Sequence, residues 1–238
     1  GVTLQLLWVE YLDVHPGGYR YSQFCERYRR FAKKLNPSMR QIHRAGEKTF
    51  VDFSGKQPSL VDPKTGEVYP VELFVGALGC SHYFYAEATA SQELECWIGA
   101  HIHMVEWFGC SSAVWVPDNL KSGITTPCRY EPGVNRTYEE CARHYGAVVI
   151  PARSAKPKDK AKVENAVLLA QRWILAALRN RTFFSLVELN MAIRELLPIL
   201  SARLMQKLKV SRRELFERLD RPAMKSLPGS RYEIGHWK

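Results

Sequence analysis

The sequence lacks several features that would assign it to a common class. No apolar run approaches the ~18 residues that a membrane-spanning helix needs, which excludes a protein that crosses the bilayer with helices. The first residues contain neither a basic segment nor a small-residue cleavage site, so we expect no secretory signal peptide. The six cysteines form no Cys-x-x-Cys pair, which excludes the commonest zinc and redox motifs and favours reduced thiols in a cytoplasmic protein.

Two motifs of large enzyme families are also missing. The sequence contains neither the G-x-S-x-G of serine hydrolases nor the phosphate-binding G-x-x-x-x-G-K-[ST]. We therefore expect no covalent serine chemistry, and any dependence on ATP would come from a partner protein. Apolar residues make up 46% and charged residues 24% of the 238 residues, as is typical of a globular protein that can bury a core.

Charge is unevenly distributed along the chain. Residues 1–50 hold 9 Lys/Arg and 4 Asp/Glu, a net charge of +5. Residues 51–150 hold 6 and 12, a net charge of −6, and residues 151–238 hold 19 and 8, a net charge of +11. Basic flanks around an acidic centre are expected of a protein that binds a polyanion and uses carboxylates for chemistry between them.

The first part of the chain is predicted to form two helices. Apolar spacing indicates helices over 4–14 and 22–35, with Ser22 as the N-cap of the second and a Pro/Gly turn at 15–21 between them. Two short helices with a turn, the second one basic, fit part of a helix-turn-helix, so we expect residues 1–46 to bind DNA. The alternative is a solvated amphipathic helix. The candidate DNA contacts in the second helix are Arg27, Arg30, Lys33 and Lys34.

From residue 48 the pattern changes to that of a sheet with helices. Runs rich in Val, Phe and Tyr predict three antiparallel strands, at 48–55, 68–79 and 82–89, with a hairpin turn at 62–66 between the first two. Helices and strands then alternate, with helices at 91–108, 138–145 and 160–180 and strands at 113–116 and 147–150. This order predicts an α/β fold in which helices cover a mixed sheet. Two more helices, at 185–199 and 211–219, precede an expected linker at 221–238.

Three carboxylates stand where this order of elements would gather them. Asp52 lies within the first strand among aromatic residues, where a charge is costly unless it is paired or bound to metal. Asp118 follows the strand at 113–116, and Glu164 lies in the first turns of the long helix. Carboxylates from separate elements bind hard divalent cations, and two such ions promote displacement at a phosphodiester. Each residue alone could equally be a satisfied strand carboxylate, a turn residue or a surface glutamate.

The sequences around these carboxylates resemble a known family. VDFSG, VPDNLK and PKDKAKVEN resemble, in order, the three catalytic blocks of the DDE transposase and retroviral integrase superfamily. The likeness is to IstA-type transposases of bacterial insertion sequences, and HRAGEKTFVDFSG and RRELFERLDRPA extend it over about residues 2–232. The resemblance implies an RNase H-like core. It also implies that Asp52, Asp118 and Glu164 are catalytic ligands of two Mg²⁺ or Mn²⁺ ions per active site.

The resemblance also implies a reaction and partners. The reaction is metal-dependent cleavage of DNA 3′ ends, followed by strand transfer during transposition of an insertion sequence. The partners are double-stranded DNA of the transposon ends and the target, other copies of the chain that hold paired ends together, and a helper AAA+ ATPase of IstB type. The expected location is the bacterial cytoplasm, without a membrane. The alternatives are a metal nuclease of the same fold without strand transfer and a non-catalytic DNA-binding regulator.

Basic residues near the candidate site are expected to neutralise DNA phosphates, and a solvated charged loop is the alternative for them. These candidates are Lys121, Arg153, Lys156, Lys158, Lys160 and Lys162. The expected domains are a helix-turn-helix-like segment (1–46), an RNase H-like core (47–182) and a helical connector with linker (183–238). His101 and His103 lie two residues apart on a predicted helix and face different directions, so we expect packing or surface roles rather than a metal pair. Trp97, Trp107 and Trp173 are expected in the core.

Overall fold

The computed structural model describes residues 2–35, 42–117, 124–126, 133–152, 161–206 and 208–235. The chain divides into two compact units, residues 1–42 and residues 43–238. Within the described ranges, no helix is long and apolar enough to span a lipid bilayer.

The first unit is a pair of helices, α1 (Leu4–Val14) and α2 (Tyr21–Leu35), with nearly the predicted bounds. Aromatic side chains hold the connecting turn to α1. The indole Nε1 of Trp8 donates to the carbonyl oxygen of Tyr19 at 2.9 Å, and the Tyr11 hydroxyl accepts from the Tyr19 N–H at 3.1 Å. Ser22 lies inside α2, so the prediction that it caps this helix is wrong.

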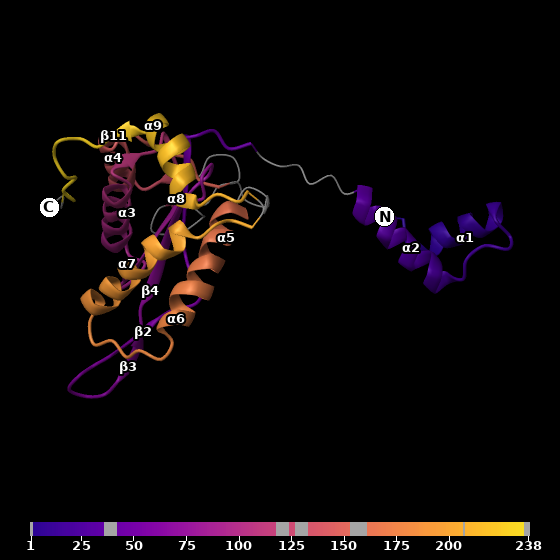
Figure 1. Ribbon diagram of the computed structural model, residues 1–238, viewed down its shortest axis with the longest axis horizontal. Coiled ribbons are helices and arrows are strands. Elements are labelled where there is room, and N and C mark those ends of the chain that lie inside the picture. The colour runs from indigo at the N-terminus through magenta and orange to yellow at the C-terminus, as the bar shows by residue number, and fades with distance from the viewer. Residues whose placement is uncertain are drawn as a thin grey trace. The chain divides into compact units, whose positions relative to one another are not determined.

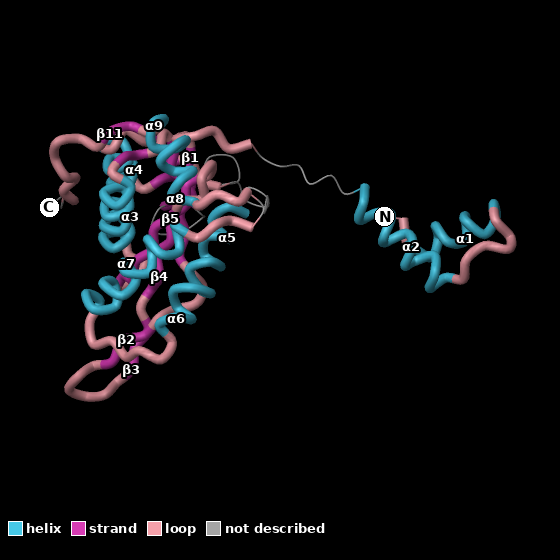
Figure 2. Tube along the Cα trace, in the orientation of Figure 1, coloured by secondary structure: helices cyan, strands magenta, loops and turns pink. Residues whose placement is uncertain are grey.

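The second unit is built on a five-stranded mixed sheet in the order β10-β7-β1-β4-β5. β4 pairs antiparallel with both β1 and β5, whereas β7 pairs parallel with both β1 and β10. This arrangement confirms the mixed α/β sheet predicted from the order of elements (Figure 1, Figure 2). The five strands are β1 (Lys48–Phe53), β4 (Glu72–Leu78), β5 (Phe84–Thr89), β7 (Val114–Pro117) and β10 (Val148–Val149).

Helices cover both faces of this sheet (Figure 1). On one side α3 (Leu94–Phe108) contributes Trp97, whose ring lies 5.4 Å from Phe53 of β1 and 5.5 Å from Phe74 of β4, centroid to centroid. α4 (Arg136–His144) packs beside α3. On the other side lies α5 (Ala161–Ala170), which continues through a π-helical turn, η2 (Gln171–Leu175), into α6 (Ala176–Leu178).

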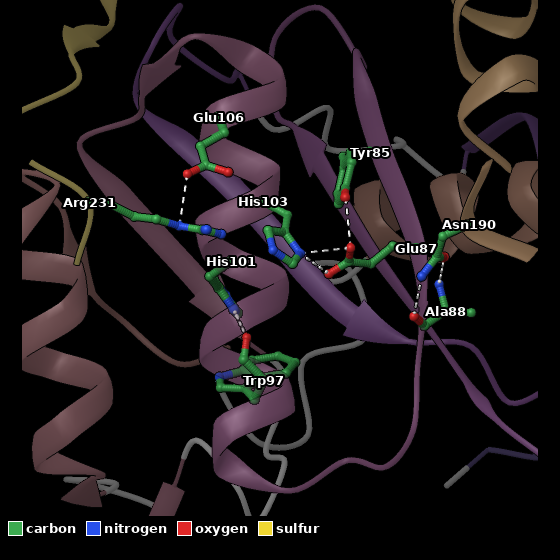
Figure 3. Close-up of polar contacts among 9 residues, drawn as sticks. All are labelled: Tyr85, Glu87, Ala88, Trp97, His101, His103, Glu106, Asn190 and Arg231. Atoms are coloured by element: carbon green, nitrogen blue, oxygen red, sulfur yellow. Dashed lines mark hydrogen bonds and ion pairs between the residues drawn. The ribbon is translucent and has the colours of Figure 1, made fainter. Parts of the chain in front are cut away.

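The outer edge of β5 is covered by α7 (Leu186–Ala202). The side-chain amide of Asn190 in α7 makes two hydrogen bonds with the main chain of one residue of β5. Its Oδ1 accepts from the Ala88 N–H at 2.6 Å, and its Nδ2 donates to the Ala88 carbonyl at 2.9 Å (Figure 3). The side-chain amide therefore replaces a neighbouring strand at this position, which protects an edge that could otherwise pair with another chain.

Shorter elements complete the second unit. The turn at 62–66 is present, but it joins β2 (Ser59–Val61) to β3 (Val68–Pro70), so the prediction that it joins the strands at 48–55 and 68–79 is wrong. The sequence pattern merged β3 with β4 and did not predict β2, because these two strands are only three residues long. The remaining elements are β6 (Cys110–Ser111), β8 (Ile124–Thr126), β9 (Gly133–Val134), α8 (Arg212–Leu215), η3 (Phe216–Asp220), α9 (Arg221–Ala223) and β11 (Lys225–Ser226).

The segment expected to be a linker, 221–238, is packed against the core over its described part. β11 pairs with β6, and the Tyr232 N–H donates to the Tyr145 hydroxyl at 3.2 Å. Just before this segment, the buried carboxylate of Asp220 accepts from the Gly46 N–H at 2.7 Å and the Ser81 N–H at 2.9 Å. The prediction of a linker is therefore wrong: Pro222 and Pro228-Gly229 interrupt local structure, but contacts with residues far apart in sequence hold the segment in place.

Candidate active site

Asp52 lies near the end of β1 on the face of the sheet that α5 covers. Side chains alternate along a strand, so Phe50, Asp52 and Ser54 share one face, while Val51 and Phe53 face α3. The contacts agree with this alternation, because the Phe53 ring packs on Trp97 of α3. Asp52 is half-buried, and its Oδ1 accepts from the Phe53 N–H at 2.8 Å. The main chain thus orients the carboxylate.

Contacts with the α5–η2 helix flank Asp52 on β1. Before it, Phe50 belongs to a small buried cluster against which Val167 of α5 packs. After it, the buried Ser54 hydroxyl accepts from Nε2 of Gln171 at 2.8 Å. The helix is therefore fixed to the strand at two points, one turn apart on the helix and on either side of Asp52.

Glu164 lies in the first turn of α5 and is exposed. It precedes Val167 by three residues and Gln171 by seven, so all three share one helix face. Because Val167 and Gln171 contact the Asp52 side of the sheet, α5 brings Glu164 to the same side as Asp52. The structure thus places two of the three predicted catalytic carboxylates on one face.

The third carboxylate, Asp118, lies outside the described residues. The residue before it, Pro117, is described, and the parallel register of β1 and β7 places Pro117 opposite Val51. These are the residues that directly precede Asp118 and Asp52 in the sequence. Across the described part of the chain, no group of three or more His, Cys, Asp or Glu could hold a metal ion, as expected when one predicted ligand falls outside it.

The donor atoms of the described pair suit a hard cation. Asp52 and Glu164 offer carboxylate oxygens, the ligand type that Mg²⁺ prefers. One oxygen of Asp52 is engaged by a main-chain N–H, an arrangement that fixes its direction. The exposure of Glu164 leaves room for waters and phosphate oxygens beside it. The chemistry of these donors therefore fits a divalent metal.

Most of the predicted DNA contacts fall where the structure describes no side chain. Those that lie outside the described residues, or whose side chains do, are Lys33, Lys34, Lys121, Arg153, Lys156, Lys158, Lys160 and Lys162. In α2, Arg27 lies over the ring of Tyr19, with Cζ 4.2 Å from the centroid. Arg30 forms an ion pair with Glu26 at 2.8 Å, and both side chains are exposed. Arg27 and Arg30 therefore remain predicted contacts.

The two histidines of α3 have the packing roles that the sequence predicts (Figure 3). Nδ1 of the buried His101 lies 2.8 Å from the Trp97 carbonyl oxygen, which can only accept, so Nδ1 carries the proton. Nε2 then accepts from the Tyr138 hydroxyl at 2.9 Å. Burial lowers the pKa of His101 to about 3. His103 instead contacts the buried carboxylate of Glu87 at 3.0 Å.

The tryptophan predictions are only partly confirmed. Trp97 is fully buried, but the side chain of Trp173 is 43% exposed, so its assignment to the core is wrong. Trp173 lies in the π-helical turn η2 and carries the guanidinium of Arg203 over its ring, with Cζ 3.7 Å from the centroid. The Lys/Arg-rich run at 203–213 is the sequence signal that could have suggested a cationic partner for the Trp173 ring.

Two curated proteins are similar to the chain along its whole length. One, from Pseudomonas fluorescens, is named "Putative transposase for insertion sequence IS1162" and is 50% identical over 240 residues, 100% of this chain and 43% of that protein. The other, from Burkholderia multivorans (strain ATCC 17616 / 249), is named "Putative transposase for insertion sequence IS408" and is 48% identical over 236 residues, 98% of this chain and 46% of that protein. The chain thus spans less than half the length of these relatives. No protein-family profile matches the chain.

A solved structure, the HTLV-2 integrase catalytic core domain in complex with magnesium (trimeric form), has a similar fold. The TM-score is 0.52 at 13% sequence identity, and the match covers 73% of this chain and 97% of that chain. At this identity the likeness concerns the fold, and it confirms the predicted RNase H-like sheet. The chain is therefore similar over its whole length to proteins named as insertion-sequence transposases, and it shares its fold with a retroviral integrase catalytic core.

Proposed function

We propose that this chain is the catalytic part of a transposase that cleaves DNA 3′ ends at the boundaries of an insertion sequence and joins them to target DNA. The observation that carries the proposal is the placement of Asp52 and Glu164 on one face of an RNase H-like sheet. The sequence similarity to proteins named as transposases supports the same activity. Strand transfer distinguishes this function from that of a simple metal nuclease.

In the proposed site Asp52, Asp118 and Glu164 hold two Mg²⁺ or Mn²⁺ ions. Such ions activate the attacking oxygen and stabilise the leaving oxygen of a phosphodiester. The chain's own contribution is to fix the carboxylates. The Phe53 N–H orients Asp52, and the contacts of Val167 and Gln171 set the position of the helix that carries Glu164. One site serves cleavage and joining, because both are in-line displacements at phosphorus and differ only in the attacking oxygen.

The proposed DNA contacts come from two basic regions. The segment 151–162 and Lys121 would neutralise phosphates around the scissile bond, and the helix pair within 1–46 would contact duplex DNA through α2. In this proposal residues 47–182 form the catalytic core and residues 183–238 form a helical connector. Two DNA ends need to be held together, so the chain would act as a homo-oligomer in the bacterial cytoplasm, assisted by an ATPase of IstB type.

The test replaces one carboxylate at a time, with Asp52→Asn, Asp118→Asn and Glu164→Gln. An amide keeps the shape of the side chain but loses the charge that holds a hard cation. We expect cleavage and joining to fall together by roughly 10²–10³-fold or more, the usual cost of removing one preorganised electrostatic group. DNA binding should persist, because it depends on Lys and Arg outside the site. The measurements are gel shifts on transposon-end DNA and a combined cleavage and joining assay with Mg²⁺ or Mn²⁺.

Asp62→Asn is the matched control, since Asp62 lies in an exposed turn where its carboxylate accepts from the main-chain N–H groups of Lys64 and Thr65. It should behave as wild type. A wild-type protein that cleaves DNA but never joins pre-cleaved ends would support the nuclease alternative. Calorimetry that detects no binding of Mn²⁺ would support the non-catalytic regulator.

A further inference from the structure

A basic hairpin follows α7. Leu204 and Ser211 form an isolated antiparallel bridge, and between them the Met205 N–H donates to the Val210 carbonyl at 3.0 Å. The turn closes with a bond of 2.8 Å from the Lys209 N–H to the Met205 carbonyl. The described residues 203–206 and 208–213, here called the basic hairpin, contain four Lys/Arg and no Asp/Glu. The hairpin is therefore a concentrated positive charge on a backbone that these bonds hold together.

Arg203, at the start of the basic hairpin, is stacked on Trp173. Its Cζ lies 3.7 Å from the centroid of the indole, and the tryptophan is 43% exposed. A guanidinium held against an aromatic face keeps its N–H groups directed outward around its edge. The stack thus presents a pre-oriented cation at the surface, next to the exposed Arg172.

Arg212 adds a second guanidinium to the same place. It begins α8 and is only half exposed, and burial together with repulsion from Arg203 lowers the pKa of Arg212. In the part of the chain that the structure describes, neither Arg203 nor Arg212 forms an ion pair with a carboxylate. Two neighbouring like charges, one of them partly desolvated, are unfavourable unless an anion approaches them.

The position of this cluster points to one kind of anion. Trp173 lies nine residues after Glu164 on one continuous helix, about 14 Å along its axis at 1.5 Å per residue. That length corresponds to about four nucleotide steps at 3.4 Å each. Nine residues also turn Trp173 about half a turn around the helix from Glu164, so DNA that reaches Glu164 would contact the cluster on the exposed side of the same helix, within this axial distance.

We propose that Trp173, Arg203 and Arg212, with the basic hairpin, form a surface that binds the sugar–phosphate backbone of DNA beside the candidate active site. The inference rests on the proposed function, because that function brings DNA to the same helix. Arginine suits this task, since its planar guanidinium donates two parallel bonds to a phosphate. The surface is distinct from the basic segment at 151–162 and from α2.

The test measures duplex DNA affinity over a range of salt concentrations, by fluorescence anisotropy without divalent metal. The variant is Arg203→Gln with Arg212→Gln in the whole chain. Each phosphate that is no longer neutralised reduces the slope of log Kobs against log salt by ~0.9, so we expect the slope to fall by nearly 2. Affinity should fall alike for all sequences, because backbone contacts carry no base specificity. Omitting metal separates this result from the cleavage chemistry.

The matched control removes two charges elsewhere, with Arg136→Gln and Arg143→Gln on α4, where both arginines are ion-paired on the opposite side of the sheet. This control should keep the wild-type slope. Arg203→Lys with Arg212→Lys keeps both charges and should retain most of the slope, which guards against a folding defect. A folded double glutamine variant with the wild-type affinity and salt slope would overturn the inference. The inference would also be overturned if poly-glutamate displaced the bound DNA as efficiently as unlabelled duplex does. A wild-type chain that binds no DNA would contradict the proposed function as well.

Discussion

At the scale of single residues, the environment of His101 keeps its ring neutral at acidic pH values where a free histidine would be protonated. The ring is fully buried against Trp97 and bonded to Tyr138, and burial lowers its pKa to about 3 from an unperturbed value of 6.5. The folded protein therefore holds His101 neutral, while the unfolded chain takes up a proton below pH 6.5. Folding stability from this residue is fully present above pH 6.5 and is lost as the pH falls toward 3.

This difference predicts a measurable pH dependence of stability. Between pH 7 and pH 5 the single histidine should cost the folded state about 2 kcal/mol, since each pH unit below the unfolded pKa is worth ~1.4 kcal/mol. The variant His101→Gln should lose that part of the slope, although it is less stable at pH 7 because the packing changes. Urea unfolding of both proteins at pH 7, 6 and 5 measures the slope. Parallel slopes would mean that His101 is protonated in the folded state or that the unfolded ring is not free.

At the scale of elements, the bond between Ser54 and Gln171 is expected to hold α5 in place relative to β1. Gln171→Leu removes the donor, and Ser54→Ala removes the acceptor, at a net cost in stability of about 1 kcal/mol. Because Glu164 lies on the same helix face, we expect Mn²⁺ affinity to weaken by about 10-fold, the lower end for groups that position a ligand. Calorimetric titration with Mn²⁺ measures this effect.

The double variant provides the control for this positioning role. If one bond links the two side chains, the double variant should bind Mn²⁺ no worse than either single variant, since the second change removes nothing further. Fully additive losses would show that each residue acts alone. Unchanged Mn²⁺ affinity in all three variants would show that the bond has only a structural role.

Local sequence signals predicted the elements whose determinants are local. Ser211 accepts from the Glu214 N–H at 3.1 Å and so caps the helix predicted from residue 211, and Ser185 caps α7, whose predicted start is residue 185. The contacts that the sequence did not reveal are distant ones. Asp220 bonds to Gly46, 174 residues away, and Gln171 to Ser54, 117 residues away. For the candidate site, the motifs predict three carboxylates, but only the packing of α5 places Asp52 and Glu164 on one face.

At the scale of the whole molecule, the two units have separate sources of stability. The main hydrophobic cluster of the second unit contains no residue before Val51. Among the described residues of the first unit, only Cys25 is buried, and Phe31 is 58% exposed. A helix pair with so little buried surface contributes little to folding, whereas its charge is large for its size: residues 1–42 hold 7 Lys/Arg and 3 Asp/Glu.

Removal of residues 1–42 should therefore separate stability from DNA affinity. We expect the chain 43–238 to unfold in urea with a free energy within about 0.5 kcal/mol of the full chain, as for changes at surfaces away from the core. Its affinity for duplex DNA should fall, and the salt slope should decrease by ~0.9 for each phosphate that α2 neutralises in the full chain. The full chain with Arg27→Gln and Arg30→Gln is the comparison, because it keeps the helices and removes two predicted contacts. If the truncated chain binds DNA with the slope of the full chain, α2 is the solvated amphipathic helix of the alternative interpretation, and DNA affinity belongs to the second unit alone.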